Sequence, residues 1–341
     1  MFPPEDYAIP KGSTVLVTGA NGYLASHVVD ILLETGFKVR GTVRSRKPWL
    51  DKLFEERHGQ EKYQSIIIPD LAAEGAYTQA MRGVAAVVHV ASDVSLRTDP
   101  ETVIGGAIDN AVNILTAASK ELSIKRFVLT SSSSAAYLPS PNNKNVVIDE
   151  NSYNDTAVDL AWDENTPEHV KATYNYVASK VESEKESFDW IDENKPGFVF
   201  NSVLPSFSTG PILHSEQFGS TMGRTRNLLK GDRLATIMFP PGYFIDVRDT
   251  ARLHIAALLD PSIGNERIFG FVHEFNWNDA ISILHKLRPN NKRIPRAPAR
   301  EWRDQATIKL KGRAEEIHKS FWDRSWIGLE ESLKDGIAGW D

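Results

Sequence analysis

The segment YNYVASK, from Tyr174 to Lys180, contains a tyrosine and a lysine four residues apart, Tyr176 and Lys180. If the segment is helical, the two side chains share one face. A free tyrosine has a pKa of about 10, which is too high for efficient proton exchange at neutral pH, and a neighbouring ammonium lowers it. Lys180 is therefore expected to activate Tyr176 as a proton donor. Pairs with this spacing also arise by chance, so a surface pair without a catalytic role stays open on this pattern alone.

A run of serines, TSSSS at residues 130–134, follows the apolar segment RFVLT. If RFVLT is a strand, the serines lie at its carboxyl end, where open parallel sheets bind ligands. Ser132 can then hold a substrate carbonyl oxygen beside Tyr176, although an ordinary serine-rich turn is the alternative. The combination predicts a reduction in which a nicotinamide cofactor delivers hydride to the carbonyl carbon. Ser132 and Tyr176 polarise the oxygen, Tyr176 donates the proton, and Lys180 also bonds the cofactor ribose.

A glycine-rich turn in VTGANGYLASH, residues 17–27, predicts where that cofactor binds. A helix that begins at Gly22 points unpaired N–H groups back at the turn, and these favour an anion. Gly19 permits the tight turn, and Gly22 lets a pyrophosphate approach the backbone. The spacing is G-x-x-G-x-x-A, so a turn that merely ends a strand stays open. The predicted cofactor contacts here are Gly19, Ala20, Gly22, Tyr23 and Leu24.

The end of the second apolar run, VRGTVRSRK, indicates which dinucleotide is bound. Enzymes that prefer NAD usually carry a carboxylate there for the ribose 2′-hydroxyl, and none occurs between Val39 and Leu50. Arg44, with two more basic residues behind it, suits a 2′-phosphate because a guanidinium binds phosphate in a forked geometry. A solvated basic loop is the alternative. We therefore expect the cofactor to be NADP, in its reduced form NADPH.

Alternating apolar runs and helical patterns predict how these residues are positioned. Near-continuous Val, Ile and Leu runs indicate strands buried on both faces, and the intervening helices indicate a parallel sheet. The fold class is thus α/β, a Rossmann-type doubly wound parallel sheet. The predicted strands cover residues 13–18, 37–43, 65–70, 85–92, 126–131 and 198–205, and the predicted helices cover residues 22–34, 101–122 and 174–194.

The domain organisation follows from where this alternation weakens. Residues 1–205 are expected to form the NADP-binding domain, with residues 138–172 as a polar, extended insertion. Residues 206–341 are expected to form a smaller, mostly helical substrate-binding lobe. The segment YFIDVRDTARLHIAALL indicates a strand stub and a helix, so the chain is expected to return to the sheet around residues 243–270.

Composition excludes several other classes of protein. The 341 residues carry a net charge of −6 and no cysteine, which argues against nucleic acid as a partner and excludes disulfides and thiolate metal sites. The histidines show no metal-ligand spacing, and the basic segment 286–313 is taken as a solvated face rather than a polyanion site. No signal peptide or apolar run of membrane-spanning length is found. We expect a cytoplasmic protein, a monomer or a homodimer.

The motifs TGANGYLASH, IPDL, VVHVAS, VLTSS, YxxxK and VLPSFSTGP occur in the order seen in extended short-chain dehydrogenase/reductases. The chain resembles that family along nearly its whole length, and within it the dihydroflavonol-reductase-like enzymes, especially fungal NADPH-dependent aldehyde and carbonyl reductases. The resemblance implies catalytic roles for Ser132, Tyr176 and Lys180. It also implies cofactor contacts at Asp70, Leu71, Val90, Ala91, Ser92, Thr130, Lys180, Pro205 and Ser208.

The sequence therefore predicts an NADPH-dependent reductase of aldehydes and ketones, and two alternatives stay open. A nucleotide-sugar epimerase or dehydratase shares the fold, but such enzymes usually prefer NAD, which Arg44 disfavours. A non-catalytic NADP-binding regulator typically lacks a Tyr–Lys pair. The segment TYNY lacks the cysteine found in plant cinnamoyl-CoA reductases, which argues against a CoA thioester as the substrate. Apolar residues that line either a substrate pocket or the core of the small lobe are Phe207, Phe218, Met222, Met238 and Phe239.

Overall fold

The computed structural model describes residues 2–93, 97–141, 145–299 and 301–340. Within these ranges the centre of the molecule is a seven-stranded sheet in the order β3-β2-β1-β4-β5-β7-β10, and all neighbouring strands run parallel. This confirms the predicted doubly wound α/β class. The strands are β1 (Thr14–Val17), β2 (Lys38–Val43), β3 (Tyr63–Ile67), β4 (Ala86–His89), β5 (Arg126–Thr130), β7 (Val199–Pro205) and β10 (Arg267–Gly270).

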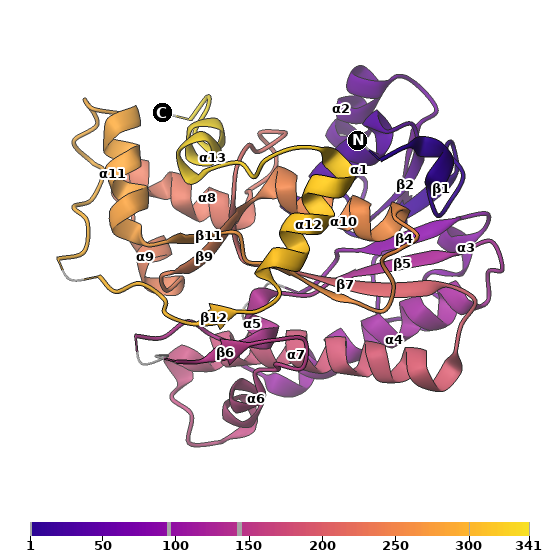
Figure 1. Cartoon of the computed structure of the whole chain (residues 1–341), viewed down its shortest axis with the longest axis horizontal. Helices are drawn as coiled ribbons and strands as arrows, with labels where there is room; N and C mark the ends of the chain where they lie inside the picture. The colour runs from indigo at the N-terminus through magenta and orange to yellow at the C-terminus, as the bar shows by residue number, and fades with distance from the viewer. Residues whose placement is uncertain (1, 94–96, 142–144, 300, 341) are drawn as a thin grey trace.

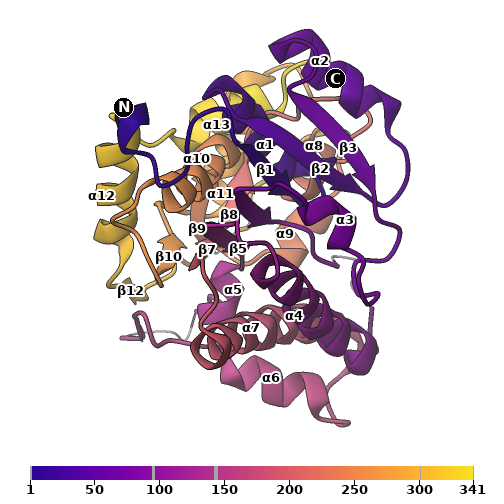
Figure 2. The ribbon, with the colours of Figure 1, turned by 90° about the vertical axis from the view of Figure 1, so that its right-hand side faces the viewer.

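Helices cover both faces of the sheet (Figures 1 and 2). On one face, α1 (Tyr23–Glu34) packs against α10 (Val247–Leu259), and α12 (Lys311–Trp322) packs on α10. On the other face, α4 (Gly106–Ser119) packs against α7 (Glu168–Asn194). The short elements around these layers are α2 (Pro48–His58), α3 (Thr78–Met81) and the π-helical turn Glu101–Gly105 that leads into α4.

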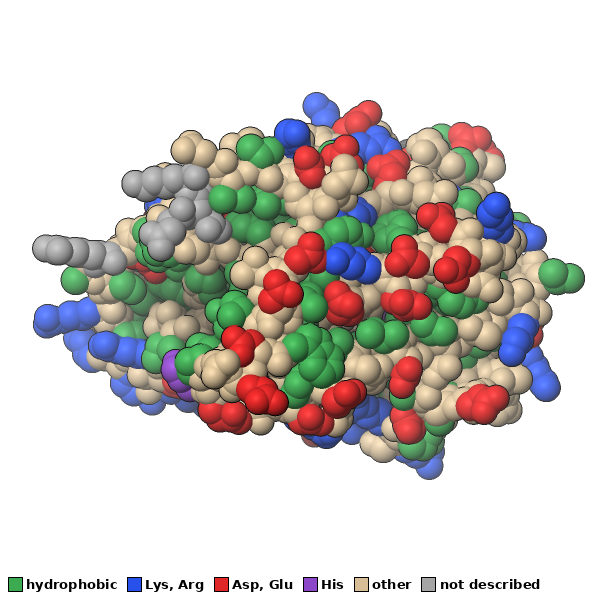
Figure 3. All heavy atoms as spheres, turned by 90° about the horizontal axis from the view of Figure 1, so that it is seen from below, with side chains coloured by type: hydrophobic (Ala, Val, Ile, Leu, Met, Phe, Trp, Pro, Cys, Tyr) green, Lys and Arg blue, Asp and Glu red, His purple; other side chains and the backbone are tan. Residues whose placement is uncertain are grey.

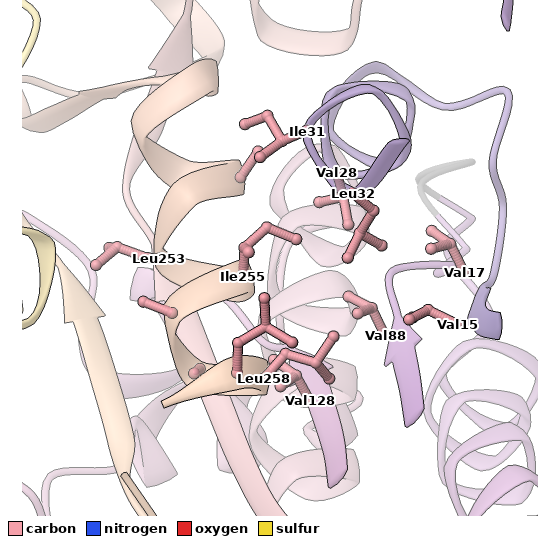
Figure 4. Close-up of a cluster of buried hydrophobic side chains, with 14 of the residues drawn as sticks. Val15, Val17, Val28, Ile31, Leu32, Val88, Val128, Leu253, Ile255 and Leu258 are labelled. Carbon is pink, nitrogen blue, oxygen red and sulfur yellow. The ribbon is translucent and has the colours of Figure 1, made fainter. Parts of the chain in front are cut away.

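Alternation along each strand divides the interior into two hydrophobic cores. In β1, Val15 and Val17 join the core under α1 and α10, whereas Leu16 joins the core under α4 and α7. Figure 4 shows the first core, where side chains from α1, α10 and the central strands meet. Each fully buried aliphatic side chain contributes roughly 1.5–3 kcal/mol of hydrophobic free energy. The strand ends that carry the candidate site are therefore held on a rigid support.

The second lobe contains a three-stranded sheet of β8 (Phe207–Thr209), β9 (Gly242–Asp246) and β11 (His273–Phe275). However, α10 and β10 return to the main sheet, so residues 247–270 belong to its layers. The division into domains 1–205 and 206–341 stays a prediction. The helices of this lobe are α8 (Ser220–Asn227), α9 (Leu234–Met238), α11 (Trp277–Leu287) and α13 (Leu329–Gly336).

The expected insertion, residues 138–172, is not simply extended. It contains α6 (Asp155–Trp162), which packs on α7, and β6 (Val147–Ile148), which pairs with β12 (Thr307–Ile308). Residues 142–144 lie outside the described part of the insertion. The helix α7 also begins six residues before the predicted start at Tyr174, at Glu168 directly after Pro167, and a proline is well suited to a helix start.

Figure 3 shows the molecule from below, the side on which α6 and α7 lie in Figure 1. Many acidic side chains gather on this face, consistent with the net charge of −6. At one end the surface is hollowed and the hollow is lined with hydrophobic side chains. Among the helices that the structure describes, none has both the length and the hydropathy needed to span a bilayer.

Candidate active site

The glycine-rich turn joins β1 to α1 at the point where the strand order reverses. Gly19 has φ 64°, and its amide donates a hydrogen bond to Thr42 Oγ1 at 3.1 Å. A Cβ on Gly19 would lie 3.2 Å from the Cα and Cβ of Ala91. Gly22 precedes α1 as its N-cap, and no side chain caps the helix. The first N–H groups of α1 are therefore available to an anion, as the sequence predicted.

The other residues predicted at this turn have different surroundings. Ala20 is buried, and its amide donates to the carbonyl of Thr42 at 3.0 Å. The ring of Tyr23 packs in the core of the second lobe, and its hydroxyl donates to the carbonyl of Gly210 at 2.9 Å. Leu24 packs on two cores. The side chain of Tyr23 is thus structural, and only the backbone of Tyr23 fits the predicted cofactor contact.

Arg44 directly follows β2 and is exposed. Within the described residues no ion pair involves its guanidinium. The neighbouring strand β3 leads to Asp70, whose carboxylate accepts a hydrogen bond from the amide of Ala72 at 2.9 Å, and to the half-buried Leu71. Since β2 and β3 are adjacent, Arg44 and Asp70 follow neighbouring strand ends. This is the edge where a dinucleotide would place its adenosine.

The segment Val90–Ser92 follows β4 and is half-buried. The hydroxyl oxygen of Thr18 accepts hydrogen bonds from the amides of Val90 at 3.0 Å and Ala91 at 2.9 Å. The same oxygen lies 2.8 Å from His89 Nδ1. Thr18 therefore fixes this segment against the glycine-rich turn, across the crevice between β1 and β4. The sequence did not single out Thr18, although it is the last residue before Gly19.

Ser132 lies just beyond the carboxyl end of β5 as the N-cap of α5 (Ser133–Ala136). Its hydroxyl accepts hydrogen bonds from the amide of Ser134 at 3.2 Å and from the Ser134 hydroxyl at 2.9 Å. The hydroxyl of Thr130 hydrogen-bonds His254 Nε2 at 2.8 Å, on α10. Thr130 therefore directs its side chain away from α7, and its carbonyl faces α7 instead.

Helix α7 brings Tyr176 and Lys180 to this same strand end. Lys180 is buried, and its Nζ donates to the carbonyl of Thr130 at 3.2 Å. The phenol of Tyr176 lies near the Ser132 hydroxyl, which acts to lower the pKa of that phenol. The three predicted catalytic residues are thus brought together around the end of β5. Their catalytic roles stay a prediction at this point.

Burial dominates the titration of both groups. Burial raises the pKa of Tyr176 above its ordinary value, and the hydrogen bond with Ser132 opposes this. Burial is thus the dominant influence on the pKa of Tyr176 in the protein alone, and the lowering expected from Lys180 stays a prediction. Burial lowers the pKa of Lys180 to about 8, and the nearby carboxylate of Glu184 opposes that lowering. A lysine that titrates near neutral pH in a buried cluster is typical of a functional site.

This titration predicts the pH dependence of turnover. If Lys180 has the predicted catalytic role, its ammonium form is the active one, and kcat should fall as the pH rises through about 8. The measurement is kcat from about pH 6 to pH 10 with saturating cofactor and substrate. We call this fall of kcat at high pH the alkaline limb. The Lys180→Arg variant keeps its positive charge over this pH range, so any activity that it retains should lack the alkaline limb. A wild-type rate that stays constant through pH 9 would contradict the assignment.

The remaining residues predicted to contact the cofactor lie at the end of β7 and after it. Pro205 ends that strand, and the Ser208 hydroxyl on β8 donates to the carbonyl of Ser206 at 3.1 Å. Between them, Phe207 stacks with Phe275 at a centroid distance of 4.9 Å. Of the apolar candidates, Met222 is fully buried in the core of the second lobe, whereas Phe218 is exposed. Met222 is thus a core residue and does not line a pocket.

The residues that the sequence discounted have structural partners. His27 hydrogen-bonds the carbonyl of Pro211 at 2.9 Å, and no group of three or more potential metal ligands occurs in the part of the chain that the structure describes. In the basic segment 286–313, Lys286, Arg303 and Arg313 form ion pairs with acidic residues of neighbouring elements. Residue 300 of this segment lies outside the described ranges.

A model of the NAD dependent epimerase/dehydratase family matches residues 15–269, from β1 to β10. The chain belongs to the NAD-dependent epimerase/dehydratase family. This confirms the resemblance to extended short-chain dehydrogenase/reductases, and the matched segment contains every residue predicted for catalysis or cofactor binding.

Curated relatives of this epimerase/dehydratase-family chain include fungal reductases. "Ketoreductase nvfG" of Aspergillus novofumigatus is 40% identical over 97% of this chain and 96% of its own length. "Aldehyde reductase 2" of Sporidiobolus salmonicolor is 37% identical over 98% of both chains. Among solved structures, Gre2 of Candida albicans in complex with NADPH superposes with a TM-score of 0.78 at 25% identity, covering 95% of this chain and 97% of that one.

Proposed function

We propose that this protein reduces aldehydes or ketones to alcohols with NADPH. The observation that carries the proposal is the convergence of Ser132, Tyr176 and Lys180 at the carboxyl end of β5. The glycine-rich turn lies two strands away in the same sheet, which is the arrangement that a bound dinucleotide requires. The ketoreductase and aldehyde reductase relatives, each aligned over nearly the whole chain, support the same reaction class.

The residues present fit a dinucleotide. The uncapped start of α1 suits a pyrophosphate, and Arg44 suits a 2′-phosphate. When bound, the reduced nicotinamide supplies the hydride. Ser132 and Tyr176 orient the carbonyl oxygen through hydrogen bonds, and Tyr176 donates the proton that completes the alcohol. Lys180 provides positive charge beside the phenolate that this transfer leaves.

The substrate is expected to be a small carbonyl compound with apolar substituents. The hydrophobic hollow in Figure 3 lies at the end of the molecule where Figure 1 places β6, β12 and α9. The cytoplasmic location and the choice between monomer and homodimer stay predictions.

One assay tests the proposal and separates it from its alternatives. NADPH absorbance is followed with a panel of ketones, α-keto esters and aldehydes. Oxidation that depends on the added carbonyl compound supports the reductase. An epimerase or dehydratase keeps its cofactor bound and gives no net oxidation, and a regulator binds NADPH without turnover. No oxidation with any member of the panel would contradict the proposal.

The 17% identity to a solved UDP-glucuronic acid 4-epimerase from Bacillus cereus, with a TM-score of 0.67, reflects the shared fold alone.

Arg44 is expected to set the choice between NADPH and NADH. Removing its guanidinium in Arg44→Ala should weaken the preference for NADPH by about 10- to 100-fold, the worth of one charge-assisted hydrogen-bond pair. The measurement is the ratio of kcat/KM for the two cofactors with one carbonyl substrate. The matched control is Arg324→Ala, which removes an arginine after α12, far along the chain from the predicted adenosine edge. Wild-type enzyme that turns over faster with NADH would contradict the role of Arg44.

A further inference from the structure

A buried carboxylate lies one helical turn beyond Lys180. Glu184 follows Lys180 by four residues on α7, so Tyr176, Lys180 and Glu184 share one face of the helix. Glu184 is fully buried. Its Oε2 accepts hydrogen bonds from the Ser131 hydroxyl at 3.0 Å and from Arg267 Nη2 at 3.0 Å. Its Oε1 accepts from the Ser202 hydroxyl at 2.5 Å and from Arg267 Nε at 3.2 Å.

These partners come from three adjacent strands of the main sheet. Ser131 follows β5, Ser202 lies on β7 and Arg267 begins β10. One carboxylate therefore sets both the rotation and the axial position of α7 over the strand end that carries Ser132. Arg267 is itself fixed, because its Nη1 donates to the carbonyls of Glu150 and Ser152 at 2.8 Å each. Its guanidinium also lies 3.8 Å from the ring centroid of Tyr153.

The same carboxylate acts on Lys180 through its charge. Burial alone disfavours the ammonium of Lys180, and Glu184 is the group that opposes this effect. From β4, His89 also faces Lys180, but burial and the lysine charge lower the pKa of His89 to about 3, so His89 is neutral. Arg267 faces Glu184 from β10. Among the described residues, Glu184 is thus the negative charge that favours protonated Lys180.

We propose that Glu184 is a positioning residue of the reaction, which fixes Tyr176 and Lys180 against Ser132 through its contacts with β5, β7 and β10. The inference rests on the proposed function, because it assigns a role within that catalytic cluster. Glu184 itself touches neither the cofactor site nor the phenol of Tyr176. Its effect on turnover passes through Lys180 and through the placement of α7.

The test is Glu184→Gln, which keeps the shape of the side chain and removes its charge. We expect kcat to fall by about 10- to 100-fold, because small displacements of catalytic groups have effects of this size. We also expect the alkaline limb of kcat to move to lower pH by about 1 unit or more, because Lys180 loses its negative neighbour while the positive Arg267 remains. Glu186→Gln, which removes one charge from an exposed position of the same helix, is the matched control and should resemble the wild type.

The outcomes separate this inference from the proposed function. A wild-type protein that oxidises no NADPH with any carbonyl compound contradicts the proposed function. An active wild type with a folded Glu184→Gln variant whose kcat and alkaline limb match those of Glu186→Gln overturns the positioning role alone. If Glu184→Gln does not fold, the variant Ser202→Ala tests the positioning role instead. It removes the hydrogen bond from Ser202 to Glu184 and keeps the charge of Glu184. A kcat reduced by about threefold or more with an unshifted limb supports the role, and an unchanged kcat overturns it.

Discussion

Replacing Tyr176 by phenylalanine is expected to lower kcat by about 10²- to 10⁴-fold, the usual contribution of a positioned proton donor. The substitution removes the hydroxyl that lies near Ser132 beside the end of β5 and leaves the ring and its packing in place. Because no predicted cofactor contact is touched, the affinity for NADPH should stay near the wild-type value. Steady-state turnover and a fluorescence titration with NADPH measure the two quantities.

Tyr174→Phe is the matched control for this variant. Tyr174 lies on the same helix, two residues earlier, and packs at the edge of two hydrophobic clusters. It should turn over at the wild-type rate, since residues two apart on a helix do not share a face. Full activity of Tyr176→Phe would remove the tyrosine from the mechanism, whatever the behaviour of the control.

Gly19→Val is expected to weaken cofactor binding strongly. Gly19 has φ 64°, a conformation that a β-branched residue strongly disfavours, and its Cβ would lie 3.2 Å from the backbone of Ala91. Backbone strain of about 1–3 kcal/mol will displace the turn from its wild-type conformation. Part of the binding free energy of NADPH must then be used to return the turn to that conformation. The dissociation constant for NADPH should therefore rise by about 5- to 160-fold, since each 1.4 kcal/mol corresponds to about a factor of ten. Titration of the folded variant with NADPH measures this change.

Gly12→Val separates the local clash from backbone strain in general. Gly12 also has a positive φ, 84°, but no atom lies within 4 Å of the Cβ it would gain, and it precedes β1. This variant should lose stability and bind NADPH as the wild type does. Equal NADPH affinities for Gly19→Val and the wild type would show that the turn does not hold the pyrophosphate.

The sheet could be predicted from the sequence because buried parallel strands are continuous apolar runs. Six of its strands have that local signal, although β3 ends at Ile67 rather than Asp70, shortly before Pro69, which cannot donate to a strand ladder. The strand β10 is only four residues long, and its place depends on pairing with β7, which is distant in the sequence. The helix α2 was missed because only Leu50 and Phe54 of its eleven residues are buried.

The site could be predicted only where its residues carry a local spacing. Tyr176 and Lys180 are four apart, and Ser132 follows an apolar strand. Glu184 continues the same spacing, but its partner Arg267 lies 83 residues later, and no local pattern links the two. The hydroxyl of Tyr23 similarly donates a hydrogen bond to the carbonyl of Gly210, which lies 187 residues later in the sequence. Long-range contacts of this kind follow from packing, which a single sequence does not display.

The late arrival of β10 has a consequence for synthesis on the ribosome. When Pro205 has emerged, the edge of β7 is unpaired, and the faces of β4, β5 and β7 that α10 covers are still bare. Residues 247–270 supply both missing elements. At rates of about 5–20 residues per second they follow roughly 3 to 13 seconds later. During that interval a stalled or truncated nascent chain exposes an open strand edge, the feature most prone to pairing with a neighbouring polypeptide.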